Sequence, residues 1–342
     1  MFNTVKKLAR PFGVSGNESE VSQFIEDEIK EYCDEVKRDT LGNLIAVKYS
    51  GNGNLNEGET REKIMLAAHM DTIGVIATHV DEKGFIRFSN LGAVKPHCAI
   101  GQTVEFESGV RGIIYHEDSP KDMANIKISD LYIDTGLSQK EIAKKVSPGT
   151  CGKFLFLSYM QGDTIISGYL DDRAGCAVLI KTAERICQEI ELGTFPPNKE
   201  VYYVFTVQEE LGLRGAGPAA FNINPDWAVA VDVICAEDVP GAKDGTIFMG
   251  KGPVIKIKDN KVICHPLIRN KLKHVAQENE IPFQLGITER GGTDAGIIHK
   301  SKGGIITGDL SIATRYIHSP VEMCSLNDLK NAVLLLTELI RI

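Results

Sequence analysis

The stretch VYYVFTVQEELG, residues 201–212, contains an apolar run that ends in two adjacent carboxylates. The β-branched and aromatic residues up to Val207 predict a buried strand, and Gly212 permits a turn after it. Side chains next to each other on a strand point in opposite directions, so Glu209 and Glu210 can serve one site only where the strand has ended. Solvated loop charges are the alternative, because most charged residues are exposed.

On both sides of this stretch, apolar segments typical of strands alternate with segments that have the apolar periodicity of a helix. The expected strands are LGNLIAVKYSG (41–51), KIMLAAHMD (63–71) and DWAVAVDV (226–233). The expected helices are DRAGCAVLIKTAERICQEI (172–190), NKLKHVAQENE (270–280) and SLNDLKNAVLLLTELIRI (325–342). This alternation predicts an α/β fold with a mixed sheet flanked by helices.

Residues 75–161 interrupt this pattern with short strand-like segments separated by turns, which are typical of a small β-rich unit. The sequence therefore predicts a catalytic domain formed by residues 1–74 and 162–342, with an inserted β-rich domain at 75–161. Two local features complete the pattern. Ser15–Glu18 has the form of a capping box for a helix over about 16–32, and the polar segment 51–63 is expected to be a hairpin loop.

The composition excludes several classes of protein. The chain has 342 residues, of which 43% are hydrophobic and 25% are charged, a balance typical of a globular protein with about two structural units. A net charge of −8 disfavours a nucleic-acid surface. No apolar stretch is long enough to span a membrane and the start lacks a signal-peptide core, so we expect a cytoplasmic protein. The eight widely spaced cysteines predict reduced, mostly buried thiols.

Metal-competent side chains stand at the ends of several predicted strands. His69 and Asp71 are two residues apart and therefore face the same side of a strand. Asp171 and Asp172 precede a helix, where an ordinary acidic N-cap explains one aspartate better than two. Asp232 interrupts an apolar strand and needs a cation, which a Lys, an Arg or a metal ion can supply.

His318, in RYIHSPVE, adds a second imidazole, although a single His before a turn is usually structural. In an α/β sheet the carboxyl ends of the strands are where sites assemble, so we expect these groups to converge. Nitrogen and oxygen ligands without thiolate suit zinc, cobalt or manganese. More carboxylates than one ion needs indicate two divalent ions.

Six motifs in this order resemble the M42 metallo-aminopeptidases, the glutamyl, deblocking and tetrahedral aminopeptidases of bacteria and archaea. The motifs are AHMDTIG, LDDRAG, TVQEELGLRGA, AVDV, GGTDAG and RYIHSP. The resemblance runs from GVSGNE (13–18) to YIHSP (316–320) and so covers nearly the whole chain. Each motif alone is unspecific, whereas the combination is specific.

The resemblance implies a role for each residue of the motifs. Asp171 would bridge two metal ions, with His69 and Asp232 completing one site, and Glu210 and His318 completing the other. Glu209 would be the general base and acid that handles the proton of a metal-activated water, and Asp71 would orient His69. Asp172 would follow the bridging aspartate across an unusual cis bond. Thr293 and Asp294, in the turn at 291–296, would line the substrate pocket, although plain turn chemistry also explains them.

The resemblance also implies that the chain removes N-terminal amino acids from short peptides, that residues 75–161 mediate dimerisation, and that dimers can form a tetrahedral homododecamer. Two other classes of function remain open. One is an endo-type glycoside hydrolase, which uses two carboxylates without metal. The other is a non-catalytic relative that retains the fold.

Overall fold

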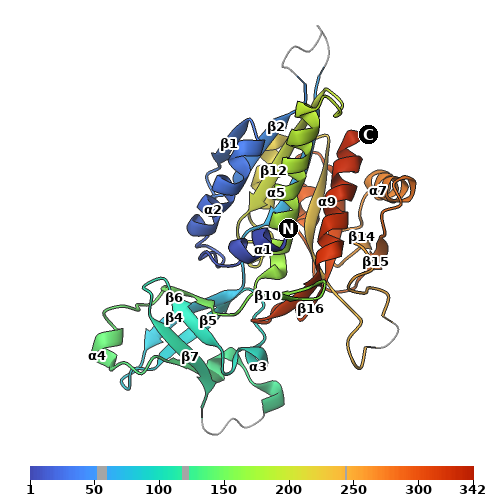
Figure 1. Ribbon diagram of the computed structural model, residues 1–342. Coiled ribbons are helices and arrows are strands. Elements are labelled where there is room, and N and C mark those ends of the chain that lie inside the picture. Colours follow the sequence, from blue (N-terminus) through green and yellow to red (C-terminus); the bar gives the residue numbers. More distant parts are fainter. Residues whose placement is uncertain (52–59, 118–122, 243–244) are drawn as a thin grey trace.

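The computed structural model describes residues 1–51, 60–117, 123–242 and 245–342. Figure 1 shows a body of strands and helices, with a smaller group of strands attached at one end. The chain leaves the body after β3 and returns to it at β10, so the smaller unit is an insertion within the larger one.

The body is built on one large mixed sheet. Its strands, in spatial order, are β1 (Glu35–Arg38), β2 (Leu44–Tyr49), β12 (Lys199–Thr206), β3 (Glu62–His69), β13 (Trp227–Cys235), β16 (Ile306–Arg315), β17 (Glu322–Ser325), β11 (Thr164–Ser167) and β10 (Tyr159–Gln161). A branch beside β16 consists of β14 (Val254–Lys258) and β15 (Gln284–Ile287). The four central strands, β12, β3, β13 and β16, are parallel to one another, while both flanks are antiparallel.

Helices cover both faces of this sheet because the central strands are apolar on both sides. Ile64 and Leu66 of β3 pack into the core beneath α5, whereas Met65 and Ala67 point to the opposite face beneath α6. The first face carries α1 (Phe2–Leu8), α2 (Ser19–Ile29), α5 (Leu170–Glu191) and α9 (Leu326–Arg341). The second carries α6 (Ala216–Ile223) and α8 (Ala295–Ile298), and α7 (Pro266–Glu278) packs beside β14 and β16.

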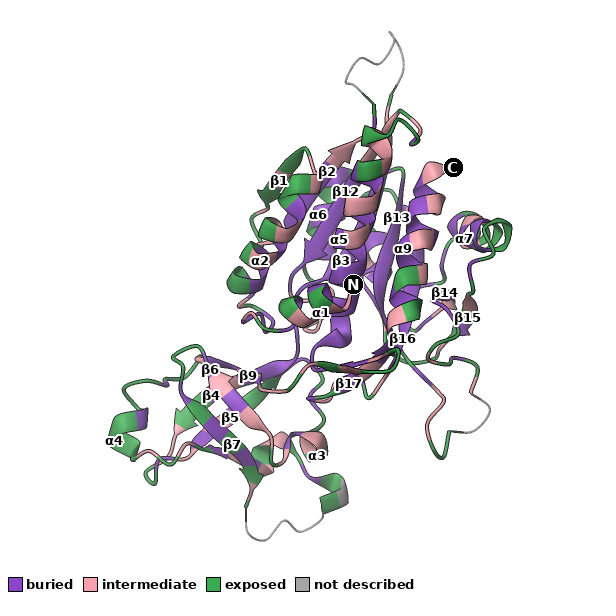
Figure 2. Cartoon of the chain, viewed as in Figure 1, coloured by how far each residue is buried: buried purple, intermediate pink, exposed green. Residues whose placement is uncertain are grey.

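The insertion is a closed antiparallel barrel with its own apolar core. Its strands, in the order of closure, are β4 (Gly74–Val80), β5 (Ile86–Leu91), β8 (Leu131–Asp134), β7 (Arg111–His116), β6 (Thr103–Phe106) and β9 (Cys151–Phe154). Short helical segments join or flank the strands: η1 (Lys30–Tyr32) in the body, and α3 (Pro96–Ala99), η2 (Met123–Asn125), η3 (Ile128–Asp130) and α4 (Gln139–Ile142) in the insertion. Figure 2 shows buried residues along the strands of both units. The predicted mixed α/β fold with a small β-rich insertion is therefore confirmed.

The domain limits predicted from the sequence stay a prediction, as does the dimerisation role of residues 75–161. The barrel strands themselves begin at Gly74 and end at Phe154, and β10 already pairs with β11 in the large sheet.

Two local predictions differ from the structure. The helix after Ser15 begins only at Ser19, and the Ser15 hydroxyl donates to Asp71 instead of capping it. The predicted hairpin loop falls largely on residues 52–59, outside the described residues. The strands on either side of it do not pair with each other, because β12 lies between β2 and β3.

Two further observations concern the whole chain. All eight cysteines are free and five of them are buried, as the spacing predicted. Across the part of the chain that the structure describes, no helix combines the length and the apolarity that a membrane crossing requires.

Candidate metal centre

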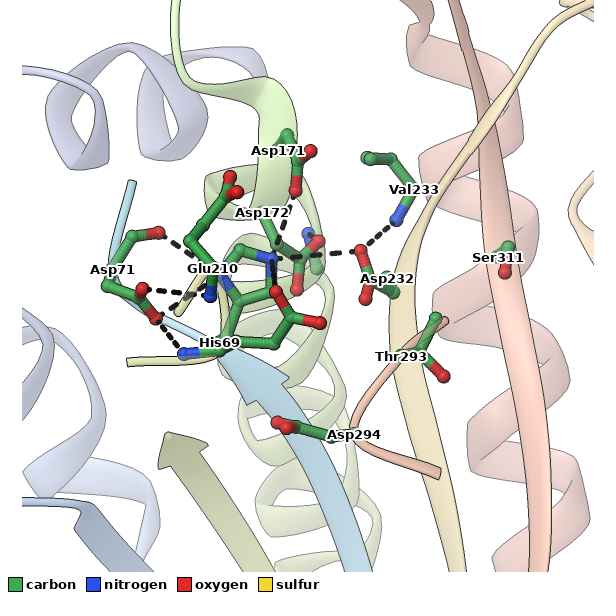
Figure 3. Close-up of polar contacts among 12 residues, drawn as sticks. His69, Asp71, Asp171, Asp172, Glu210, Asp232, Val233, Thr293, Asp294 and Ser311 are labelled. Atoms are coloured by element: carbon green, nitrogen blue, oxygen red, sulfur yellow. Dashed lines mark hydrogen bonds and ion pairs between the residues drawn. The ribbon is translucent and has the colours of Figure 1, made fainter. Parts of the chain in front are cut away.

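The candidate site lies at the carboxyl ends of three parallel strands, where the backbone stops pairing and side chains can converge. His69 is the last residue of β3 and lies opposite Thr206, the last residue of β12. Asp232 lies within β13, the neighbour of β3 on its other side. Figure 3 shows these side chains meeting Asp171 and Asp172 from the start of α5. The expected convergence at this edge of the sheet is thus observed.

The side chains form two groups, each with three ligand atoms within 4.8 Å of one another. One group consists of His69, Asp172 and Asp232, and the other of Asp171, Glu210 and His318. We call them the His69 group and the His318 group.

Asp171 connects the two groups through its two carboxylate oxygens. Its Oδ1 lies 3.0 Å from Nε2 of His69, and its Oδ2 lies 3.2 Å from Nε2 of His318. The peptide bond between Asp171 and Asp172 is cis, as the resemblance implied. Asp172, which was not predicted to be a ligand, adds a further carboxylate to the His69 group.

Burial and mutual repulsion perturb the ionisable groups of the site. Burial raises the pKa of Asp232 and of Asp172 well above the usual range, and the negative charges of neighbouring aspartates add to this. Burial lowers the pKa of His69, but the surrounding carboxylates, Glu209 first, outweigh it and raise the pKa well above its usual value. Such a cluster contains more buried negative charge than two imidazoles can neutralise.

Two buried oxygens point to a cation at this place. Among the described residues, Oδ2 of Asp172 and Oε1 of Glu210 are buried without a hydrogen-bond donor. A buried, unpaired carboxylate oxygen is costly, and a divalent ion would satisfy it. The donor set of imidazole and carboxylate fits a zinc-class ion. The residues present therefore fit a metal centre.

Asp71 holds the segment that follows β12. Its Oδ1 accepts from the Glu209 N–H at 2.9 Å, and its Oδ2 accepts from the Glu210 N–H at 3.2 Å and from the Ser15 hydroxyl at 2.6 Å. The same carboxylate lies 3.5 Å from Nδ1 of His69. Asp71 is thus placed to orient both His69 and the two glutamates.

The two adjacent glutamates face different partners. Oε2 of Glu210 lies 3.3 Å from Nε2 of His318, inside the His318 group. Oε2 of Glu209 lies 3.9 Å from Nε2 of His69 and belongs to neither group. Burial raises the pKa of Glu209 well above its usual range, with further contributions from the charges of Asp232 and Asp294. One carboxylate can therefore bind an ion while the other exchanges a proton.

Thr293 and Asp294 lie at the edge of the site and are held by internal hydrogen bonds (Figure 3). The Thr293 hydroxyl donates to Asp309 at 2.5 Å, and Asp294 accepts from the Thr206 hydroxyl at 2.5 Å. Burial raises the pKa of Asp294 to about 6. Both side chains are buried, and their role in substrate binding stays a prediction.

Several residues that support the site were not recognised from the sequence. Glu322 accepts hydrogen bonds from the main chain of Asp171 and His318, and Lys256 donates to Asp309 beneath Thr293. Glu322 stands four residues after His318, inside the same motif RYIHSPVE, and is the acidic residue nearest to it in the sequence. That closeness to His318 was the available signal. Lys256 gave no comparable signal because lysine and isoleucine alternate in its strand VIKIK, as they do in an ordinary half-exposed strand.

Comparison with known proteins identifies the family. The chain matches the M42 glutamyl aminopeptidase family over residues 42–335, and it belongs to that family. It is 49% identical over 341 residues to a protein of Acetivibrio thermocellus named as an aminopeptidase, covering 99% of this chain and 98% of the relative.

Two solved structures are similar over nearly their whole length. The TET aminopeptidase of the marine sediment archaeon Thaumarchaeota archaeon SCGC AB-539-E09 has 33% identity and a TM-score of 0.91, covering 99% of this chain and 95% of that one. The TET1 peptidase of Pyrococcus horikoshii, described as assembling into a tetrahedron or a large octahedral shell, has 32% identity and a TM-score of 0.83, covering 98% of both chains. The chain is therefore an enzyme of the aminopeptidase class.

Proposed function

We propose that this chain is a two-metal aminopeptidase that removes N-terminal amino acids from short peptides. Membership of the M42 family supports the peptidase class. The observation that carries the two-ion part is the position of Asp171, whose two oxygens face His69 and His318 at 3.0 and 3.2 Å.

In this proposal, His69, Asp232 and Asp171 would hold one ion, and Asp171, Glu210 and His318 would hold the other. Asp172 lies close enough to His69 and Asp232 to add a donor to the first. The nitrogen and oxygen donor set favours zinc or cobalt, with manganese as the next candidate. A pair of divalent ions bound here supplies an acidified water and an electrophile for the scissile carbonyl.

The residues of the chain then carry the proton. Glu209 takes the proton from the attacking water at its carboxylate and later delivers it to the leaving amine. Its buried position, which raises its pKa, suits a group that must both accept and release a proton near neutral pH. Asp71 keeps Glu209 in place through the main-chain hydrogen bond at 2.9 Å.

We also infer that the chain assembles with itself, as a homodimer through residues 75–161 that can build up into a tetrahedral homododecamer. The similarity to the TET1 peptidase over 98% of both chains supports this inference. A closed shell would admit short peptides and exclude folded proteins.

The test is hydrolysis of a panel of aminoacyl-p-nitroanilides by chelated protein, before and after addition of zinc, cobalt or manganese. We expect activity to return with metal, and Glu209→Gln to lower kcat by about 10²- to 10⁴-fold with metal binding retained. The ranking of the panel gives the preferred N-terminal residue. Inactivity on every free N-terminus, or cleavage of polysaccharide that persists in chelator, contradicts the proposal and favours a glycosidase or a non-catalytic relative.

A further inference from the structure

A buried glutamate that the proposed mechanism does not use lies directly behind the His318 group. Glu322, on β17, is 1% exposed. Its Oε2 accepts from the Asp171 N–H at 3.0 Å, and its Oε1 accepts from the His318 N–H at 3.1 Å. One carboxylate therefore joins the main chains of two residues that are far apart in the sequence but adjacent in the site.

Both of these residues lie where the backbone is irregular. Asp171 has φ −80° and ψ 102°, which are not helical although it lies in the first turn of α5. His318 has φ 62°, in the left-handed region that a non-glycine residue rarely adopts. Regular helix or strand hydrogen bonds do not hold such positions, so a side-chain acceptor has to define them.

The arrangement repeats what Asp71 does on the other side of the site. Asp71 accepts from the main-chain N–H groups of Glu209 and Glu210 with its two oxygens, just as Glu322 accepts from those of Asp171 and His318. Each buried carboxylate thus fixes a pair of functional residues through their backbone rather than through their side chains.

We propose that Glu322 is a positioning residue that sets the separation of Asp171 and His318 and thereby the metal affinity of the His318 group. The inference rests on the proposed two-metal function. Glu322 itself touches no substrate in this account. It acts by holding the two main chains, and groups that orient ligands typically change metal affinity by about 10- to 100-fold when they are removed.

Replacement of Glu322 by glutamine tests the inference with little change of shape. The amide keeps one acceptor oxygen but presents an NH₂ group to the second N–H, so either Asp171 or His318 loses its acceptor.

Asp328 provides a matched control elsewhere in the fold. It is buried on α9, and its two oxygens accept from the main-chain N–H groups of Gly250 and Gly252 at 2.7 and 2.8 Å. Asp328→Asn makes the same chemical change away from the site.

The experiment is a competition titration of zinc between a chromogenic chelator and the metal-free wild type, E322Q and D328N, with thermal unfolding of each measured in parallel. We expect two zinc equivalents in the wild type, one of them about 10- to 100-fold weaker in E322Q, and none weakened in D328N. A loss of thermal stability in both variants is compatible with this result, because both leave a buried N–H unpaired.

Three outcomes separate the proposals. Wild-type protein that binds no zinc overturns the proposed function and this inference together. Wild-type protein that binds two equivalents while E322Q binds both equally tightly overturns this inference alone. If E322Q does not fold, Glu322→Asp carries the test, since it keeps both acceptor oxygens but withdraws them from the main chain. Unchanged zinc affinity in that variant overturns the inference as well.

Discussion

The His69 group and the His318 group differ in how the fold holds them. The side chain of His69 is 2% exposed and extends from a central parallel strand, with Asp232 on the next strand. The side chain of His318 is 31% exposed and extends from a turn, with Glu210 on a loop. The sheet therefore builds one half of the site, and irregular backbone held by carboxylates builds the other.

Two contacts join the barrel insertion to the His318 group and its immediate surroundings. Lys95 donates to the carbonyl oxygen of Ile317 at 2.6 Å, next to His318. Gly92 packs so closely on Glu210 that a Cβ at that position would lie 2.8 Å from a carboxylate oxygen. We expect the buried His69 group to be a structural part of the body, and the open His318 group to be the adjustable side of the site.

The largest effect is expected where the two groups meet. Asp171→Asn removes the carboxylate that faces both imidazoles, so both ions should bind poorly and activity should fall roughly 1,000-fold, the equivalent of several kcal/mol of transition-state stabilisation. Asp172→Asn should weaken only the His69 group, by roughly 10-fold. Zinc stoichiometry and kcat/KM of both variants give the result, and equal losses would contradict a shared role for Asp171.

The next prediction compares how much each group contributes to the stability of the metal-free protein. His69→Ala removes a buried imidazole from Asp171 and Glu209, and breaking such a buried pair should destabilise the metal-free protein by about 3 kcal/mol. His318→Ala, where the imidazole is 31% exposed and better solvated, should destabilise the protein less than His69→Ala. Urea unfolding of the chelated proteins measures both. A larger loss for His318→Ala would reverse the comparison and place the structural weight in the turn.

A pH dependence should distinguish the open group further. Burial lowers the pKa of His318, but hydrogen bonds to Asp171 and Glu210 outweigh it and raise the pKa to about 11. The folded, metal-free protein then holds a proton that the unfolded chain releases above about pH 6.5. In this window the folded state binds more protons, so its stability decreases as the pH rises.

Bound zinc needs the neutral imidazole, so its protection should increase over about the same range, from pH 6 to pH 8. Denaturation midpoints with and without zinc across this range provide the measurement. His318→Ala is the control and should weaken both trends, while His69, whose pKa is also raised, accounts for what remains. Zinc protection that is independent of pH in the wild type would show that His318 is not a ligand.

The difference between the His69 group, which the sheet holds, and the His318 group, which irregular backbone holds, also explains which parts of the site could be predicted from the sequence. His69, Asp232 and the end of β12 follow from strand patterns, because apolar periodicity reports burial and strand ends report where a site can form. The grouping of Asp171 with both imidazoles followed only from the family resemblance, and the support from Glu322 was not predicted at all, because both depend on main-chain geometry between segments as far as 151 residues apart. Local patterns carry no such information, which is also why β12 was not expected between β2 and β3.

The smallest effect should come from Ser15, where a sequence pattern indicated a helix cap and the structure shows a contact with the site. Ser15→Ala removes one of the donors to Asp71, which keeps the N–H groups of Glu209 and Glu210. We expect a loss of about 1 kcal/mol in unfolding free energy and less than about a threefold change in kcat/KM. Ser22→Ala is the matched control, because its buried hydroxyl, in the first turn of α2, accepts from Arg38, which is not part of the site. If S15A lowers kcat/KM about tenfold or more while S22A does not, the His69 side of the site depends on the N-terminal segment as strongly as the His318 side depends on its turn.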